Sequence, residues 1–315
     1  MKAIGGYFEL ELNKFDEFHI DAIKLNTGRN AFEYILRANN YSKIYIPYYT
    51  CDVVLEPLKK TNIAYEFYKI NSDFEPIFDF ENVKETEAFL YTNYFGLKGN
   101  VMTKLSKLCP RLIIDNAQAF YDRPVKNVDT FYSPRKFFGI ADGAYLYSNK
   151  KIEQNFTQDK SYNRFEHLLR RADEDAETGY SYFVNNDQNL CGQPILQMSN
   201  LTVQMLKNIN YEAIATIRKE NFNYLHQALN TINQVKWNSV NDIVPLVYPF
   251  YTENFNLKNE LTKNRIYTAQ YWPNVLNWVD EKSIEYKYCV NLIHLPIDQR
   301  ISKIELDTII KIIKS

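Results

Sequence analysis

A lysine and an aspartate stand at two points of this sequence where a charged side chain is unusual. Lys136 lies in the stretch FYSPRKFFG, between a Ser-Pro-Arg run and two phenylalanines. Asp115 stands twenty-one positions earlier and ends the apolar run RLIID. Taken alone, the lysine fits a solvated surface and the aspartate fits a helix N-cap. Taken together, an amine and a buried carboxylate are the groups that form a Schiff base and hold a protonated ring nitrogen.

Alternating strands and helices in the first half of the chain would position these two residues. Apolar runs predict strands at 43–47, 63–70, 88–96 and 111–115, and amphipathic spacing predicts helices at 29–38, 51–60 and 101–110. This alternation is typical of βαβ units and indicates an α/β fold with a mostly parallel sheet. Two further short strands are predicted at 129–133 and 143–148, joined by the turn that holds Lys136.

The character of the sequence changes after about residue 150. Residues 151–190 are polar and charged and are expected to form a long excursion, and residues 194–232 are expected to form one long helix. The last part has strand-like runs at 242–250 and 290–298 and a terminal helix at 303–315. We therefore expect a large domain over residues 1–210 and a smaller α+β domain over residues 211–315.

Composition narrows the class of protein. The chain has 315 residues, and 45% of them are hydrophobic, which is typical of a globular protein. Its 37 basic and 38 acidic residues nearly balance, so the sequence predicts no basic surface for nucleic acid or an anionic membrane. The beginning of the chain lacks the apolar core of a signal peptide, so we expect a cytoplasmic location. The four cysteines are far apart and form no CxxC pair, and the four histidines are equally scattered, so no metal site is expected.

Several polar residues follow directly on predicted strands. Ligands of open α/β sheets bind at the carboxyl ends of parallel strands, and Thr50, Tyr94, Asp115 and Lys136 all stand at or after such ends. A cofactor that needs both an amine and an acid is pyridoxal 5'-phosphate. Gly28, at the start of a predicted helix, would expose the backbone amides of Arg29 and Asn30 to its phosphate.

The order of these motifs resembles that of the DegT-class sugar-nucleotide aminotransferases, which have the aspartate aminotransferase fold, PLP fold type I. The resemblance rests on five stretches in chain order: LNTGRNAFEYIL, IYIPYYTCDVVLEPL, TNYFG, LIIDNAQAF and FYSPRKFFGIADGAYLYSNK. The most specific part is Asp-x-x-Gln followed by the lysine. The resemblance implies a three-layer α/β/α large domain with a mixed, mostly parallel sheet and a smaller α+β C-terminal domain.

The resemblance also implies roles for single residues. Lys136 would form the Schiff base and then move the proton of the transamination, and Asp115 would pair with the pyridine nitrogen. Gln118 would contact the ring hydroxyl, and the alternative for this residue is a solvated helix face.

Some family positions are occupied by other residue types here. Cys51 stands where the family places the aromatic residue that stacks on the ring, so Tyr49 or Tyr94 would cover the ring instead. Phe131 replaces the phosphate-binding serine, and Ser133 is the nearest hydroxyl. Gln197-Met198-Ser199 matches only in part the Arg-Met-Ser segment through which the family's partner subunit approaches the cofactor.

These observations predict a homodimeric PLP-dependent aminotransferase. It would move an amino group from glutamate to a keto sugar nucleotide for surface polysaccharide synthesis. A different PLP reaction is one alternative. A family member that keeps the fold for a regulatory or scaffold role is another.

Overall fold

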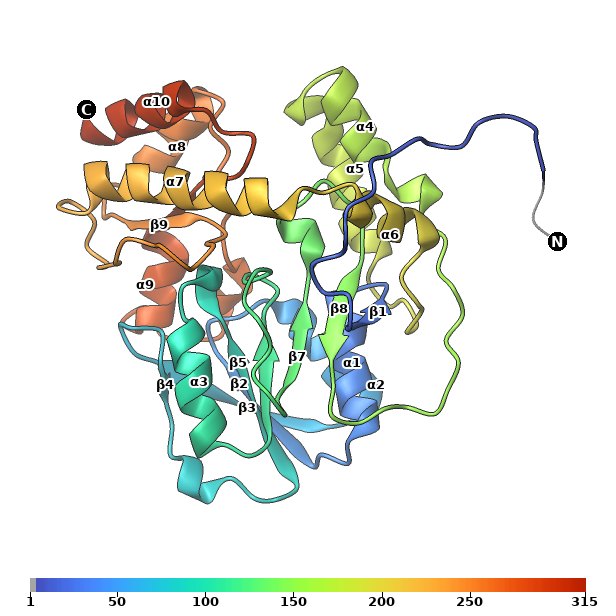
Figure 1. Cartoon of the computed structure of the whole chain (residues 1–315). Helices are drawn as coiled ribbons and strands as arrows, with labels where there is room; N and C mark the ends of the chain where they lie inside the picture. The colour runs from blue at the N-terminus through green and yellow to red at the C-terminus, as the bar shows by residue number, and fades with distance from the viewer. Residues whose placement is uncertain (1–3) are drawn as a thin grey trace.

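The chain is built around one eight-stranded mixed sheet. The structure is a computed structural model and describes residues 4–315. The strands are β1 (Ile23–Leu25), β2 (Lys43–Pro47), β3 (Ala64–Ile70), β4 (Pro76–Ile77), β5 (Glu87–Thr92), β6 (Leu112–Asp115), β7 (Asp129–Tyr132) and β8 (Ala144–Tyr147). They are ordered β1-β8-β7-β6-β5-β2-β3-β4, and the run from β7 to β3 is parallel (Figure 1). The predicted α/β fold class is thereby confirmed.

Helices cover both faces of this sheet because its strands bury side chains on both sides. Ile113 of β6 joins one apolar cluster, with α1 (Gly28–Ala38) and α2 (Leu55–Thr61). Its neighbours Leu112 and Ile114 join another, which includes α3 (Gly99–Leu108). Successive residues of a strand point to opposite faces, so a short apolar run such as LIID serves both clusters.

The middle of the chain differs from the expectation in two ways. Residues 151–190, expected as an excursion, contain a hairpin of α4 (Glu166–Asp173) and α5 (Ala176–Asn189). The single long helix expected over 194–232 is wrong, since α6 (Asn200–Lys207) ends before α7 (Tyr211–Leu229) begins. The break occurs where Asn210 caps the new helix, its side chain accepting the amide of Ala213.

The C-terminal part has a small sheet and an apolar cluster of its own. The antiparallel strands β9 (Tyr248–Tyr251) and β10 (Leu292–Leu295) pair with each other and are accompanied by α8 (Leu257–Lys263), α9 (Ile284–Asn291) and α10 (Lys303–Lys314). Both strands are shorter than predicted. Pro245 cannot donate to a strand ladder, and residues 290 and 291 belong to α9. Phe222, Tyr248, Leu295 and Leu306 are buried together between these elements.

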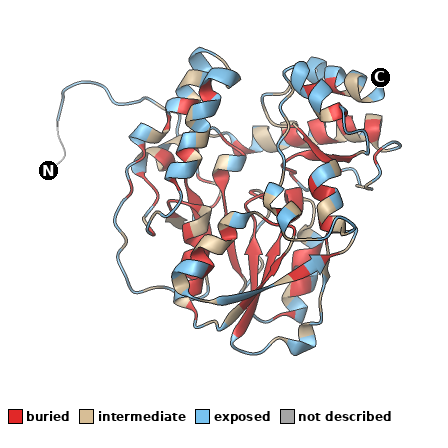
Figure 2. Ribbon diagram, turned by 180° about the vertical axis from the view of Figure 1, so that it is seen from behind, coloured by how far each residue is buried: buried red, intermediate tan, exposed pale blue. Residues whose placement is uncertain are grey.

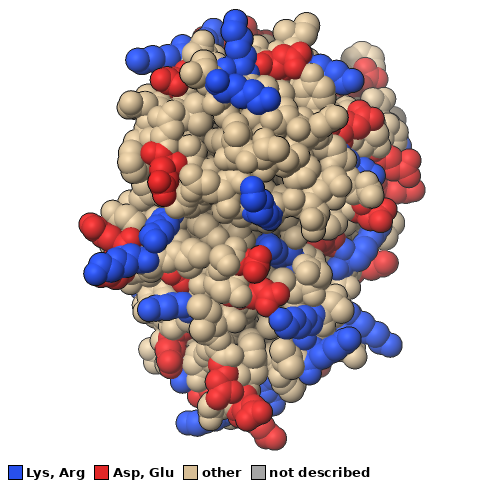
Figure 3. All heavy atoms as spheres, turned by 90° about the vertical axis from the view of Figure 1, so that its left-hand side faces the viewer, with Lys and Arg blue, Asp and Glu red and all other residues tan. Residues whose placement is uncertain are grey.

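The distribution of burial and charge is that of a compact globular chain. Figure 2 shows the central strands buried and the outer faces of the surrounding helices exposed. Basic and acidic side chains are interspersed on the face drawn in Figure 3, so no field of a single sign covers that face. None of the helices in residues 4–315 is both long and apolar enough to cross a membrane.

Candidate functional site

Asp115 and Lys136 lie at the carboxyl ends of neighbouring parallel strands. Asp115 is the last residue of β6 and lies opposite Phe131 of β7. Lys136 ends the 3₁₀ turn η4 (Pro134–Lys136), which follows β7. Burial raises the pKa of Asp115, and the positive charge of Lys136 acts on this carboxyl group in the opposite direction. The two side chains are therefore close enough for their charges to interact.

The turn around Lys136 directs this side chain outward. The amide of Lys136 donates to the carbonyl of Ser133 at 3.2 Å, and the amide of Phe137 donates to that of Pro134 at 2.9 Å. Phe137 and Phe138 are buried, whereas Lys136 is exposed. The two phenylalanines anchor the turn in the core, and the lysine between the anchor and Pro134 stays accessible.

Only one of the two polar atoms in the side-chain amide of Gln118 has a hydrogen-bond partner within residues 4–315. Its side-chain oxygen accepts the backbone N–H of Phe95 at 3.0 Å, but its Nε2 is buried without an acceptor among residues 4–315. A buried donor without a partner costs on the order of 1–3 kcal/mol, which a ligand oxygen could recover. At 1% exposure Gln118 does not lie on a solvated helix face, so that explanation is wrong.

Asp115 likewise caps no helix. One of its carboxylate oxygens accepts the amide of Ala117 at 2.8 Å within a turn, and no helix begins in the residues that follow directly. Among the described residues its other oxygen, Oδ2, accepts no hydrogen bond and is available to a protonated nitrogen. The helix N-cap explanation is therefore also wrong.

The N-terminus of α1 presents free amides beside the Lys136 turn. The N-cap Thr27 accepts the amide of Asn30 at 3.1 Å, so the expected phosphate contact from that amide is already occupied. The amides of Gly28 and Arg29 have no acceptor within residues 4–315. A β-carbon built on Gly28 would lie 3.8 Å from that of Ser133, which places the serine against this helix end.

Ser133 adds a side-chain hydroxyl at the same place, and Arg29 carries a guanidinium on the first turn of α1. Ser133 is 8% exposed, and its hydroxyl forms no hydrogen bond within the described chain. The guanidinium of Arg29 lies 3.8 Å from Glu56 and 4.0 Å from Asp187, and its Nη1 is buried without a hydrogen-bond acceptor in residues 4–315. An anion at this helix N-terminus would meet amides, a hydroxyl and the positive end of the helix dipole.

The structure does not expose the two tyrosines expected to cover the cofactor ring. Tyr49 and Tyr94 are both fully buried, and the hydroxyl of Tyr94 donates to the carbonyl of Tyr49 at 2.9 Å. Cys51 is half-buried, and the positive charge of Lys136 is close enough to act on the pKa of its thiol. Burial raises the pKa of Cys51 to about 11, so this thiol is neutral near pH 7.

The C-terminal part of the chain supports the site in a way that the sequence did not reveal. Asn274 donates to the carbonyl of Thr50 at 2.9 Å. Arg218 of α7 donates to the carbonyl of Phe137, next to Lys136, at 3.2 Å. Both supporting residues lie more than eighty positions after the groups they hold. No spacing or motif in the sequence points to either.

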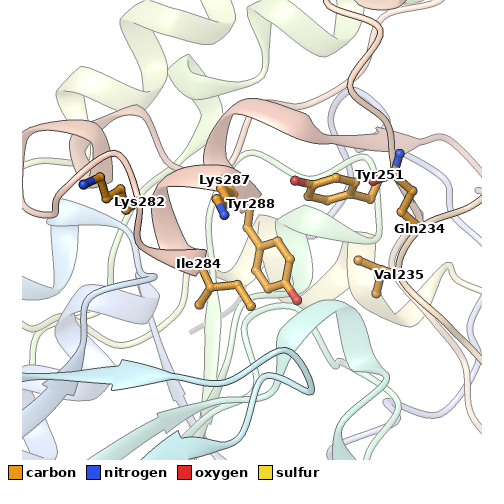
Figure 4. Close-up of a pocket in the computed structure, with 7 residues that line it drawn as sticks. All are labelled: Gln234, Val235, Tyr251, Lys282, Ile284, Lys287 and Tyr288. Atoms are coloured by element: carbon orange, nitrogen blue, oxygen red, sulfur yellow. The ribbon is translucent and has the colours of Figure 1, made fainter.

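Two open pockets in residues 4–315 lie apart from these residues. One, of about 280 Å³, lies beside α9 and is lined by Ile284, Lys287, Tyr288 and Tyr251 among others (Figure 4). The other, of about 450 Å³, lies beside β1 and the segment 151–158. At the carboxyl ends of β6 and β7, Lys136 is exposed in the single chain, whereas Asp115 and Ser133 are buried.

Comparison with known proteins identifies the fold. The sequence matches no protein-family model and no curated protein sequence. The structure is similar to DesV from S. venezuelae, with a TM-score of 0.64, 15% identity and coverage of 96% of this chain and 85% of that chain. It is also similar to a DegT DnrJ EryC1 StrS aminotransferase from Brucella abortus, with a TM-score of 0.61, 15% identity and coverage of 93% and 85%.

This chain has the fold of the sugar aminotransferases. A third similar structure is the sugar aminotransferase CalS13 from Micromonospora echinospora, with a TM-score of 0.63, 14% identity and coverage of 94% and 87%. Spr1654 from Streptococcus pneumoniae, with TM-scores near those values, has been solved in apo, PLP and PMP forms. The implied PLP fold type I is confirmed by these similarities together with the sheet order.

The residues at the carboxyl ends of the strands fit pyridoxal phosphate, with which the similar structure of Spr1654 has been solved. Gln118 has an orphaned amide for a ring oxygen, and Asp115 has a free carboxylate oxygen for a ring nitrogen. Gly28 and Ser133 present donors for a phosphate, and Lys136 presents an accessible amine.

Proposed function

We propose that this protein is a PLP-dependent aminotransferase that moves an amino group from glutamate to a keto sugar carried on a nucleotide. Lys136 and Asp115 carry the proposal, because they stand on adjacent strand ends of a fold shared with sugar aminotransferases. When bound, the cofactor supplies an electron sink for negative charge at the substrate carbon.

In this proposal each residue of the site has one task. Asp115 keeps the ring nitrogen protonated, and Gln118 donates its free amide N–H to the ring oxygen. The amides of Gly28 and Arg29, with the Ser133 hydroxyl, hold the phosphate. Lys136 would hold the cofactor and then, as a free amine, would take the proton from the substrate carbon and deliver it to the cofactor carbon that carried the aldehyde.

Proposed along with this activity are a homodimer, a cytoplasmic location and a role in surface polysaccharide synthesis. Lys136 is exposed in the single chain, and a second subunit would exclude water from it. Large apolar side chains on and before the α4–α5 hairpin are also exposed, namely Tyr162, Leu169, Tyr180 and Phe183. A C2 dimer is the commonest way to cover such a surface. The four free cysteines fit a reducing compartment.

The half-reaction with glutamate tests the proposed activity. Purified protein loaded with PLP should convert glutamate to 2-oxoglutarate in an amount equal to the active sites, measured by a coupled dehydrogenase assay. Lys136→Ala is the control and should release none. PLP binding without the half-reaction would favour the regulatory or scaffold alternative, or another PLP reaction with a different amine. Absence of PLP binding would contradict the proposal as a whole.

A further inference from the structure

Arg218 is an unusual residue because its charged side chain is enclosed in the protein and has no ion-pair partner among residues 4–315. It is 1% exposed and stands on α7, at the border between the large sheet and the C-terminal elements. Asp298 attracts it only at longer range and is itself bonded to Arg300. Burial lowers the pKa of Arg218 to about 10, which still leaves it charged at neutral pH. An enclosed charge of this kind is costly unless its hydrogen bonds are needed.

The hydrogen bonds that Arg218 forms within residues 4–315 all go to backbone carbonyls. Nη1 donates to Leu246 at 3.0 Å and to Pro245 at 3.4 Å, and Nη2 donates to Phe137 at 3.2 Å. The guanidinium also lies over the ring of Phe137, 4.7 Å from its centroid. Phe137 follows Lys136 directly, so Arg218 holds the residue after the lysine by both its carbonyl and its ring.

The same guanidinium connects to the Gln118 side of the site. The amide of Leu246 donates to the carbonyl of Phe95 at 2.8 Å, and the amide of Phe95 donates to the side chain of Gln118 at 3.0 Å. A continuous series of hydrogen bonds therefore runs from Gln118 through Phe95, Leu246 and Arg218 to Phe137. Its two ends are the proposed ring contact and the residue that follows the proposed Schiff-base lysine.

A second donor reinforces the end of the series next to Lys136. Gln299, after β10, donates its Nε2 to the same Phe137 carbonyl at 3.1 Å. Two residues of the C-terminal part thus converge on one backbone oxygen. Within residues 4–315 the turn also has its own short-range bonds to Ser133 and Pro134, and Arg135 donates to Asp187 at 2.8 Å.

From this arrangement we infer that Arg218 is a positioning residue, which sets the Lys136 turn at a fixed distance from the ring contact of Gln118. The inference rests on the proposed function. It places no ligand on Arg218, which acts only through Phe137 and Leu246. Misplacement of a reacting group by about 1 Å can cost on the order of 10²-fold, so a small shift of this turn would have a measurable effect.

Comparing two forms of the cofactor tests the inference without measuring turnover. Pyridoxal phosphate binds with a covalent bond to Lys136, whereas pyridoxamine phosphate lacks the aldehyde and binds through the ring and phosphate contacts alone. Arg218→Met removes the donors and the charge while keeping a long apolar side chain. It should weaken pyridoxal phosphate binding by about tenfold or more and leave pyridoxamine phosphate binding within about twofold.

Asn223→Leu is the matched control. Asn223 stands on the same helix, is partly buried, and within residues 4–315 its side chain bonds only to the backbone of Val240. Asn223→Leu should cost stability without changing the ratio of the two affinities. In cofactor-free protein, hydrogen exchange at the amides of Lys136, Phe137 and Phe138 should be faster in Arg218→Met than in Asn223→Leu.

The outcomes separate this inference from the function on which it rests. If Arg218→Met does not fold, Gln299→Leu removes the other donor from the same carbonyl and should lower the same affinity ratio. An unchanged ratio in a folded variant, or an equal change in Asn223→Leu, overturns the role of Arg218 alone. Wild-type protein that binds neither cofactor form overturns both the proposed function and this inference.

Discussion

Gly28 and Ser133 lie against each other at the start of α1, where a β-carbon on Gly28 would contact the β-carbon of Ser133 at 3.8 Å. This is an ordinary van der Waals distance, so the site has room for one methyl group but little more. Gly28→Ala should therefore retain PLP affinity. Gly28→Val adds two methyl groups at this contact and should weaken PLP binding with little loss of fold. Absorbance titration with PLP measures both variants, and circular dichroism checks the fold.

Equal affinity in the two Gly28 variants would place the phosphate elsewhere. Ser133→Ala provides a second test at the same place, because it removes a hydroxyl that has no protein partner among residues 4–315. If that hydroxyl bonds the phosphate, its loss should cost on the order of 1 kcal/mol of binding free energy.

Lys136→Ala should abolish covalent attachment of PLP while leaving noncovalent binding. The ring and phosphate contacts remain, but the amine that attaches the cofactor and moves the proton is gone. Transamination should fall by at least the roughly 10²- to 10⁴-fold that general acid–base catalysis contributes. Borohydride reduction and peptide mass mapping should find the pyridoxyl label on Lys136 of the wild type. A label on another lysine would show that this residue is not the Schiff-base lysine.

Asp115→Asn should lower the transamination rate without lowering the stability of the folded protein. Burial raises the pKa of Asp115 in the folded protein, so ionisation at neutral pH opposes folding. The isosteric amide avoids that cost, and the cofactor-free variant should unfold at an equal or higher urea concentration than the wild type. It cannot hold a protonated ring nitrogen, and its transamination rate should fall about 10²-fold or more. A variant that is fully active would remove Asp115 from the site.

The titration of Asp122 should lower the free energy of unfolding as the pH rises. Its carboxylate accepts Asn93 at 2.6 Å, yet burial raises its pKa from 3.8 to about 6. The folded state therefore binds the proton more tightly than the unfolded state. The contribution of Asp122 to stability is full below about pH 4 and is lost as the pH rises through 6, by up to about 3 kcal/mol. Urea unfolding of wild type and Asp122→Asn between pH 4 and 7 should show a steeper decline for the wild type, and parallel curves would contradict this.

The proposed dimer should depend on the α4–α5 hairpin. Tyr180 is 65% exposed and stacks on Phe183 with ring centroids 6.4 Å apart. A charge at this position would have to be buried in the proposed interface, so Tyr180→Asp should shift the protein toward monomer in sedimentation velocity. Ile304→Asp on α10 is the control, since Ile304 is equally apolar and 79% exposed. A wild type that sediments as an active monomer would exclude the dimer.

The sequence by itself determined the α/β class and the placement of Asp115 and Lys136 after strands. Both follow from local rules, because short apolar runs separated by amphipathic segments can bury their faces only in a helix-covered sheet. The carboxyl ends of parallel strands share one edge of such a sheet, so residues after two runs such as RLIID and DTFYS come together. The helix predicted over 29–38 is also present, and α1 begins one residue earlier, at Gly28, with Thr27 as its N-cap.

Only the tertiary structure decided which polar groups are free and which are engaged. Asn30 appeared available in the sequence, but its amide is taken by Thr27. For Gln118 the sequence left a solvated helix face as the alternative to a ring contact, but the residue is buried and its Nε2 has no acceptor among residues 4–315. Arg218 belongs to a helix that the sequence extended too far, and its contacts with Phe137 and Leu246 join parts of the chain with no shared motif. Hydrogen bonds to backbone carbonyls leave no trace in residue type, because every residue carries the same carbonyl group.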